Sequence, residues 1–132
     1  MFFRTETLKS IEVLTPNNPL EDLYAQLKLT HKGYTADVMN DVLAYYRIHP
    51  DNTYKNLEYM LNNVLKTYEC FKDDPYYEQA KYKFLNGMLL RTAKRNTKLA
   101  IQVLSMIPFR HYNNKTWRAL PKLIFSKGKA NV

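Results

Sequence analysis

The residue types best suited to chemistry in this chain stand together in one segment, "SMIPFRHYNNKTWRAL", residues 105–120. Cations and aromatic rings alternate along this segment, and it contains no acidic residue. Arginine and lysine contact phosphate oxygens, while tyrosine and tryptophan rings stack on bases or on arginine. The segment therefore predicts a contact with nucleic acid. The candidate contact residues, with one lysine just downstream, are Arg110, Tyr112, Lys115, Trp117, Arg118 and Lys122.

A structural role is the alternative for the two rings. Tyr112 and Trp117 could close the end of a helical bundle while the neighbouring cations stay in water. The two roles are compatible. We expect Trp117 to anchor the segment on the fold, and we expect the cations Arg110, Lys115 and Arg118 to be exposed around it.

A second group of cations precedes this segment. It consists of Arg91, Lys94, Arg95 and Lys98, whose spacing of i, i+3, i+4 and i+7 would place them on one face of an uninterrupted helix. Such a face predicts further phosphate contacts. The alternative is that these cations complement the dipole at the C-terminal end of a helix. Both interpretations stay open.

Charge is distributed unevenly along the whole chain. The formal net charge is +8, and Glu78 is the last acidic residue. Residues 79–132 contain twelve lysines and arginines. Solvated surfaces usually mix both signs, because like charges repel one another. The distribution favours a polyanion or an acidic protein surface as the partner, and the alternative is a basic tail with no specific anion.

Signals for catalysis or metal binding are weak. Gly33, Gly87 and Gly128 are too far apart to form a phosphate-binding loop. None of the three histidines has a ligand partner four residues further on, as metal-binding helices do. We therefore expect a protein that is not an enzyme and that has no metal site and no cofactor.

Two pairs of carboxylates stand close together in the sequence. Asp37 and Asp41 would lie one helical turn apart and could hold a divalent ion with a third ligand. The favoured interpretation places Asp37 at a helix N-terminus and Asp41 on the solvated face. Asp73 and Asp74 are interpreted as a helix cap.

Length and composition limit the class of protein. The 132 residues are 45% hydrophobic and 14% aromatic, which predicts one folded domain over residues 1–132 with residues 126–132 as a flexible tail. The single cysteine, Cys70, cannot form an internal disulfide or a cysteine-based zinc site. The sequence has no signal-peptide pattern and no long apolar stretch. We expect a cytoplasmic protein without a membrane contact, located in the host cytoplasm if a phage encodes it.

Helical periodicity positions the candidate residues. Five main helices are predicted, and their short links imply an all-α, mostly antiparallel bundle with a short basic C-terminal segment. The last of them ends at Pro108, and only a short turn or helix is expected over residues 116–120. The five helices are predicted over about residues 19–32, 35–49, 54–71, 75–95 and 97–107.

Residues that cap helices mark several of these boundaries. Asn18 is predicted to cap the first helix, with Pro19 in its first turn. Asp74 is predicted to cap the fourth. At the next boundary, Asn96 is expected to adopt a left-handed conformation and Thr97 to cap the following helix.

Two stretches resemble the small subunit of T4-type phage sliding-clamp loaders. In "YTADVMNDVLAYY", Tyr34, Asn40 and Leu43 are spaced as at the start of a helix in that family. The run "NTKLAIQVLSMIPFRHYNNKTW" resembles the end of the family's first conserved region. The matching positions there are Leu99, Val103, Leu104 and Ile107, then Arg110 and Tyr112, then Trp117. The resemblance implies a non-catalytic helical component that joins an ATPase partner, in a complex that places a ring clamp on primed DNA.

Two functions are therefore predicted. The first is a small accessory protein that engages nucleic acid, DNA above all, or a replication machine bound to it, through a basic C-terminal half. The alternative is a protein–protein interaction module, an inhibitor or adaptor encoded by a phage, which binds an acidic surface on a host protein complex.

Overall fold

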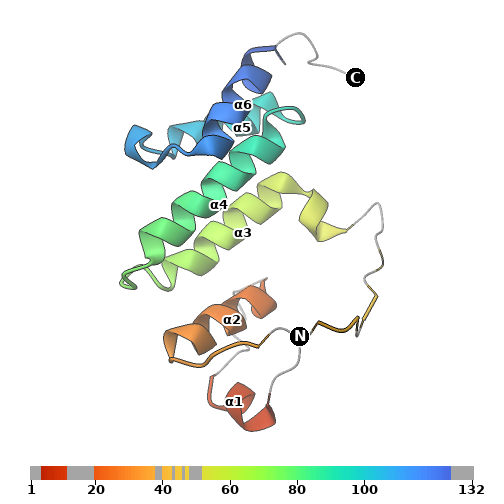
Figure 1. Ribbon diagram of the computed structural model, residues 1–132, viewed down its shortest axis with the longest axis vertical. Helices are drawn as coiled ribbons and strands as arrows, with labels where there is room; N and C mark the ends of the chain where they lie inside the picture. Colours follow the sequence, from red (N-terminus) through yellow and green to blue (C-terminus); the bar gives the residue numbers. More distant parts are fainter. Residues whose placement is uncertain are drawn as a thin grey trace. The chain divides into compact units, whose positions relative to one another are not determined.

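The computed structural model of the protein describes residues 4–11, 20–37, 40–42, 44–45, 47 and 52–125. Every regular element within these ranges is a helix, so the predicted all-α fold is confirmed (Figure 1). Five of the described α-helices have more than one or two turns. The elements are α1 (Thr5–Lys9), α2 (Glu21–His31), η1 (Thr53–Lys55), α3 (Leu57–Glu69), α4 (Tyr77–Thr92), α5 (Thr97–Ser105), η2 (Phe109–His111) and α6 (Asn114–Phe125).

The chain forms two compact units, Met1–Asp74 and Pro75–Val132. The first unit contains α1, α2, η1 and α3, and the second contains α4, α5, η2 and α6. The expectation of a single domain over residues 1–132 stays a prediction. The predicted tail at residues 126–132 lies outside the described residues.

Small apolar contacts organise the first unit. Ile11, just after α1, is buried in a cluster with Ala25 and Leu29 of α2. Helix α2 also contacts α3. Beyond the end of α3, the ring of Phe71 lies 5.8 Å from that of Tyr24, measured between ring centroids. The apolar side of α2 therefore packs against Ile11, which precedes it in the chain, and Phe71, which follows it.

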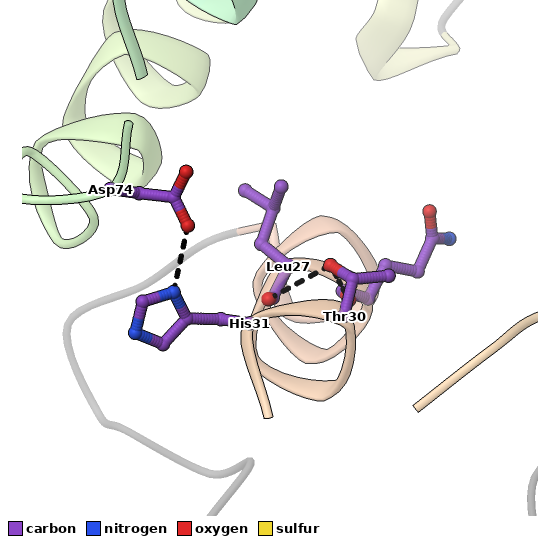
Figure 2. Close-up of polar contacts among 5 residues, drawn as sticks. Leu27, Thr30, His31 and Asp74 are labelled. Atoms are coloured by element: carbon purple, nitrogen blue, oxygen red, sulfur yellow. Dashed lines mark hydrogen bonds and ion pairs between the residues drawn. The ribbon is translucent and has the colours of Figure 1, made fainter. Parts of the chain in front are cut away.

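A hydrogen bond between His31 and Asp74 joins the end of α2 to the turn after α3. The His31 Nδ1 atom lies 2.8 Å from the Asp74 Oδ2 atom, and the two side chains face each other in Figure 2. The His31 ring also meets Phe71 edge-on. The prediction that Asp74 caps the next helix is wrong, because α4 begins at Tyr77 with Tyr76 at its N-cap position.

Helix α3 has the apolar stripe that its sequence predicts. Leu57, Leu61 and Val64 are buried at a spacing of about one helical turn. The Asn56 side chain caps the helix by accepting a hydrogen bond of 3.0 Å from the backbone N–H of Tyr59. The regular stripe is why the sequence located this helix well, whereas the cap at Asn56 was not predicted and starts the helix later than expected.

The second unit is built on α4, the longest described helix. Figure 1 shows α5 and α6 (cyan to blue) lying against α4 (green), and both contact it. The core consists of buried apolar side chains from all three helices, each of which stabilises the fold by about 1.5–3 kcal/mol. These residues are Leu85, Met88, Leu89, Ala93, Leu99, Ala100, Val103, Ile107, Ala119 and Leu123.

The turn between α4 and α5 differs from the expectation for Asn96. Its φ angle is −149°, so the backbone is extended and not left-handed. The Asn96 side chain instead accepts a hydrogen bond of 3.0 Å from the backbone N–H of Leu99, and Asn96 is therefore the N-cap of α5. Asparagine serves either role, and the sequence alone favoured the wrong one. The predicted cap of α2 at Asn18 lies outside the described residues.

The helix predicted over about residues 35–49 is absent from the described part of that segment. Residues 40–42, 44–45 and 47 are not helical. The Tyr45 side chain is 95% exposed, and Val42 is also exposed. A helix of this length is marginal in water unless its apolar face packs on something. Periodicity predicted an apolar face, but it could not show whether a partner covers that face.

Helix α6 is longer than the short turn predicted over residues 116–120. It runs from Asn114 to Phe125 with Pro121 inside it. Proline cannot donate the hydrogen bond that the carbonyl of Trp117 would otherwise accept, so the sequence favoured an earlier end. Thr116, Ala119 and Leu123 are nevertheless buried on one face, and this packing keeps the helix intact past the proline.

Candidate functional site

The basic-aromatic segment forms a tight structure between α5 and α6. Pro108 is followed by the single turn η2, and Tyr112 then has an extended backbone. The Asn113 Oδ1 atom accepts a hydrogen bond of 2.9 Å from the backbone N–H of Lys115 and so caps α6. The chain turns back sharply, and the side chains of η2 come next to the first turn of α6.

Three aromatic rings meet at this turn, and we call them the aromatic platform: Phe109, Tyr112 and Trp117. The Trp117 ring centroid lies 6.4 Å from that of Phe109 and 6.1 Å from that of Tyr112, with the ring planes nearly perpendicular. Phe109 and Tyr112 are 5.2 Å apart. Such edge-to-face contacts are favourable. The rings therefore hold one another in place.

The platform is mostly exposed. Trp117 is 54% exposed and Phe109 is 74% exposed. The prediction that Trp117 anchors the segment in the fold is therefore only half right: the ring contacts its neighbours in the segment but does not enter the core. The neighbouring Thr116 enters the core instead, because the buried face of α6 lies one residue away.

A buried polar network holds the platform on α4. Asn86 of α4 is 1% exposed. Its Nδ2 atom donates to the carbonyl of His111 at 3.0 Å and to that of Tyr82 at 2.7 Å. Its Oδ1 atom accepts a short hydrogen bond from the Thr116 hydroxyl. One side chain thus connects α4 to both η2 and α6, and each buried polar group in this set has a partner.

His111 adds a second link between η2 and α4. Its ring stacks on the Tyr82 ring, with the centroids 3.9 Å apart and the planes 19° apart. The His111 Nε2 atom accepts a hydrogen bond of 3.0 Å from the Arg110 Nε atom. This bond orients the Arg110 guanidinium along the platform segment.

The cations of the segment surround the platform, and we call Arg110, Lys115 and Arg118 the platform cations. All three are exposed, as the sequence predicted, while Lys122 is half-buried. The Arg110 Nη2 atom lies 3.9 Å from Glu78 Oε2, with both side chains largely in water, so this ion pair is weak. In the described part of the chain, no acidic side chain pairs with Lys115 or Arg118.

Arg91, Lys94, Arg95 and Lys98 form a separate group, which we call the turn cluster. All four are exposed, but they do not share one helical face. Helix α4 ends at Thr92 and α5 begins at Thr97, so two of the cations lie in the turn. The expectation of one face required an uninterrupted helix, and Asn96 interrupts it by capping α5.

Arg110 and the turn cluster lie near opposite ends of α4. Arg110 is beside Glu78 in the first turn of α4, and Arg91 is in the last turn. At about 1.5 Å of rise per residue, the backbones of Glu78 and Arg91 are about 20 Å apart along the helix. Lys115 lies between them, because its Nζ atom is 3.8 Å from the position of a Cβ atom on Gly87, one turn before Arg91. The candidate cations are therefore spread along α4.

Several residues that build this site were not among the predicted site residues. They are Phe109, Asn86, Thr116, His111, Tyr82 and Asn113. Phe109 stood in the quoted segment, and its position next to Arg110 was an available signal. Asn86 and Thr116 gave no signal, because their importance comes from a contact between residues thirty positions apart.

Within the described residues, no group of three or more histidine, cysteine, aspartate or glutamate side chains is placed to hold a metal ion. Asp37 and Asp41 are both exposed. None of the described helices has the length and apolar character needed to cross a membrane.

No protein-family model, curated protein or solved structure matches this chain.

Proposed function

We propose that this protein is a small non-enzymatic accessory protein that binds nucleic acid through its second compact unit. The observation that carries the proposal is the charge of that unit. From α4 to the end of α6, its exposed surface presents two groups of cations, the platform cations and the turn cluster, and Glu78 is the only acidic residue in the sequence of these elements. A polyanion is the ligand that gains most from such a surface.

The exposure of the cations supports a phosphate contact. Side chains that already lie in water lose little hydration when they approach a phosphate, whereas buried charges carry a large desolvation cost. Lysine and arginine of the two groups can also contact phosphates of one strand at separate positions. Contacts of this kind position a protein on nucleic acid without selecting a sequence.

The proposal is tested by neutralising the platform cations. The triple variant Arg110→Gln, Lys115→Gln, Arg118→Gln is expected to bind a DNA oligonucleotide at least tenfold more weakly in moderate salt. The matched control neutralises three exposed lysines of the first unit, Lys9, Lys66 and Lys72, and so removes the same total charge. Equal losses for both variants would mean that only net charge matters, and the proposal would fail.

A finer form of the proposal places the protein in a replication machine. The resemblance to the clamp-loader small subunit supports an ATPase partner and a role on primed DNA. A pull-down from the native host, with and without nuclease, tests this form. An ATPase that stays bound after nuclease treatment would support it, and nuclease-sensitive proteins alone would limit the function to nucleic-acid binding.

Helix α6 favours a second candidate function, binding to an acidic protein surface. At about 100° per residue, Trp117, Ile124 and Phe125 fall in one sector of the helix, and all three are exposed. The cations Arg118 and Lys122 fall in the adjacent sector. An apolar stripe beside a cationic one suits a partner that is apolar at its centre and acidic at its edge.

This second function predicts a different response to mutation. The variant Ile124→Ser, Phe125→Ser is expected to lose a nuclease-resistant protein partner while keeping its affinity for DNA. A variant that keeps every captured protein would contradict the second function.

A further inference from the structure

The exposed rings of the platform indicate the kind of ligand more narrowly than the cations do. Phosphate contacts need only positive charge, so a surface that bound the backbone alone would have no use for large apolar rings in water. Phe109 and Trp117 are both more than half exposed. They stand beside Arg110 and on α6 between Lys115 and Arg118. Rings and charges therefore lie where one ligand would meet both.

The rings are held firmly enough to act as a stacking surface. Trp117 follows Thr116, whose hydroxyl is fixed by Asn86 in the core. Phe109 lies in η2, whose last residue, His111, is tied to α4 through its carbonyl and its ring. Each edge-to-face contact occupies one face of only one of the two rings, and Trp117 and Phe109 stay 54% and 74% exposed, so ring surface is left for a base. A surface that is already ordered loses little conformational entropy when a ligand binds.

Resting on the proposed function, we propose that the platform binds single-stranded nucleic acid by stacking unpaired bases on Trp117 and Phe109, while the platform cations hold the adjacent phosphates. Base faces are open only in unpaired nucleotides, since a duplex already stacks each base on its neighbours. Aromatic stacking combined with a cationic track is the established chemistry of single-strand binding without sequence selection. The site thus distinguishes a single strand from a duplex of the same charge density.

The chain offers a direct probe, because Trp117 is its only tryptophan. The first measurement titrates the full-length protein with oligothymidylate and with an abasic strand of equal length, and follows tryptophan fluorescence. Oligothymidylate is expected to quench the emission strongly and to bind more tightly than the abasic strand. If both strands bind equally well and leave the emission unchanged, no base stacks on the platform and the proposal is wrong.

The second measurement compares Phe109→Ala and Trp117→Ala in binding to a single strand and to a duplex. Each substitution is expected to weaken single-strand binding by about fivefold to one hundredfold and duplex binding by less than about twofold. Trp117→Phe, which keeps a ring, is expected to recover most of the loss. The matched control is Ile101→Ala, because Ile101 of α5 is 52% exposed, and it is expected to change neither affinity.

The outcomes separate this proposal from the proposed function. If the platform variants weaken both ligands equally, or if polyglutamate quenches Trp117 as strongly as oligothymidylate, the platform recognises charge and not bases. The nucleic-acid function would then stand and the stacking proposal would fall. If the wild-type protein binds neither the single strand nor the duplex, both are overturned.

Discussion

At the scale of single residues, Asn86 has the widest influence in the second unit. Its amide uses both donor and acceptor atoms, and its partners belong to α4, η2 and α6. An asparagine in the middle of a helix is unfavourable on propensity alone. Its burial here is compensated by complete hydrogen bonding, and the position of the platform depends on it.

Replacing Asn86 with alanine is expected to lower the free energy of unfolding by about 2–4 kcal/mol, because the Thr116 hydroxyl and the His111 carbonyl both lose their buried partner. Asn63→Ala is the matched control, since the Asn63 amide also bonds to a carbonyl one turn earlier and, among the described residues, forms no hydrogen bond to another helix. Urea denaturation measures both. A loss no larger for Asn86 than for Asn63 would show that the network does not hold the platform.

The burial of Tyr68 in α3 predicts how the free energy of unfolding changes with pH. Burial raises the pKa of the Tyr68 phenol, because desolvation disfavours the phenolate. The unfolded chain therefore releases this proton at lower pH than the folded chain does. Tyr68 contributes fully to the free energy of unfolding below the ordinary tyrosine pKa of about 10. That contribution is lost as pH rises through the higher folded-state pKa.

The free energy of unfolding is accordingly expected to fall above about pH 10, and to fall less steeply in Tyr68→Phe. Denaturation curves between neutral and strongly alkaline pH measure this difference. Identical pH profiles for the two proteins would show that Tyr68 is not buried in the way described.

At the scale of the elements, the backbone requires glycine at Gly33 but not at Gly87. Gly33, just past the end of α2, has a φ of +85°, a conformation that residues other than glycine rarely adopt. Gly87 lies inside α4, and a Cβ atom there would meet the Lys115 Nζ atom at 3.8 Å, an ordinary contact. Gly33 therefore helps to end α2, whereas Gly87 only lowers the stability of α4.

Gly87→Ala is expected to raise the free energy of unfolding by about 0.5–1 kcal/mol, because alanine restricts the unfolded chain and suits a helix. Gly33→Ala is expected to lower the free energy of unfolding, through backbone strain at its positive φ. Thermal unfolding of the two variants gives the test. Shifts of the same sign in both would contradict the conformations assigned to these residues.

The sequence predicted those elements in which local signals and packing agree. Helix α3 has a regular stripe that is buried, and it was located well. The segment around residues 35–49 had a stripe but is not helical in its described residues, whereas α6 continues past a proline because Thr116, Ala119 and Leu123 are buried. Neither a stripe nor a proline reports whether packing stabilises a helix.

The candidate site was predictable in its composition but not in its assembly. The exposure of Arg110, Lys115 and Arg118 followed from their charge. The exposure of Trp117 did not, because its neighbour Thr116 takes the buried position through a contact with Asn86. The separation of the turn cluster from Arg110 also depends on where α4 ends, which Asn96 decides.

At the scale of the whole molecule, charge is divided between the two compact units. Acidic residues are confined to the first unit and the start of α4, so the remainder of the second unit has one sign of charge. Such a unit repels itself in isolation, and that repulsion is relieved when a polyanion binds. Binding through this unit should therefore weaken steeply as salt increases, because each phosphate contact releases counterions.

The central claim is that exposed cations of the second unit bind phosphates, and the most direct test is the salt dependence of affinity. The Kd for a single-stranded oligonucleotide would be measured between low and moderate salt for the wild type and for the Arg110, Lys115, Arg118 glutamine variant. The account predicts a steep linear dependence of log Kd on log salt, with a slope about two units shallower in the variant. An affinity that stays flat with salt in the wild type would contradict it.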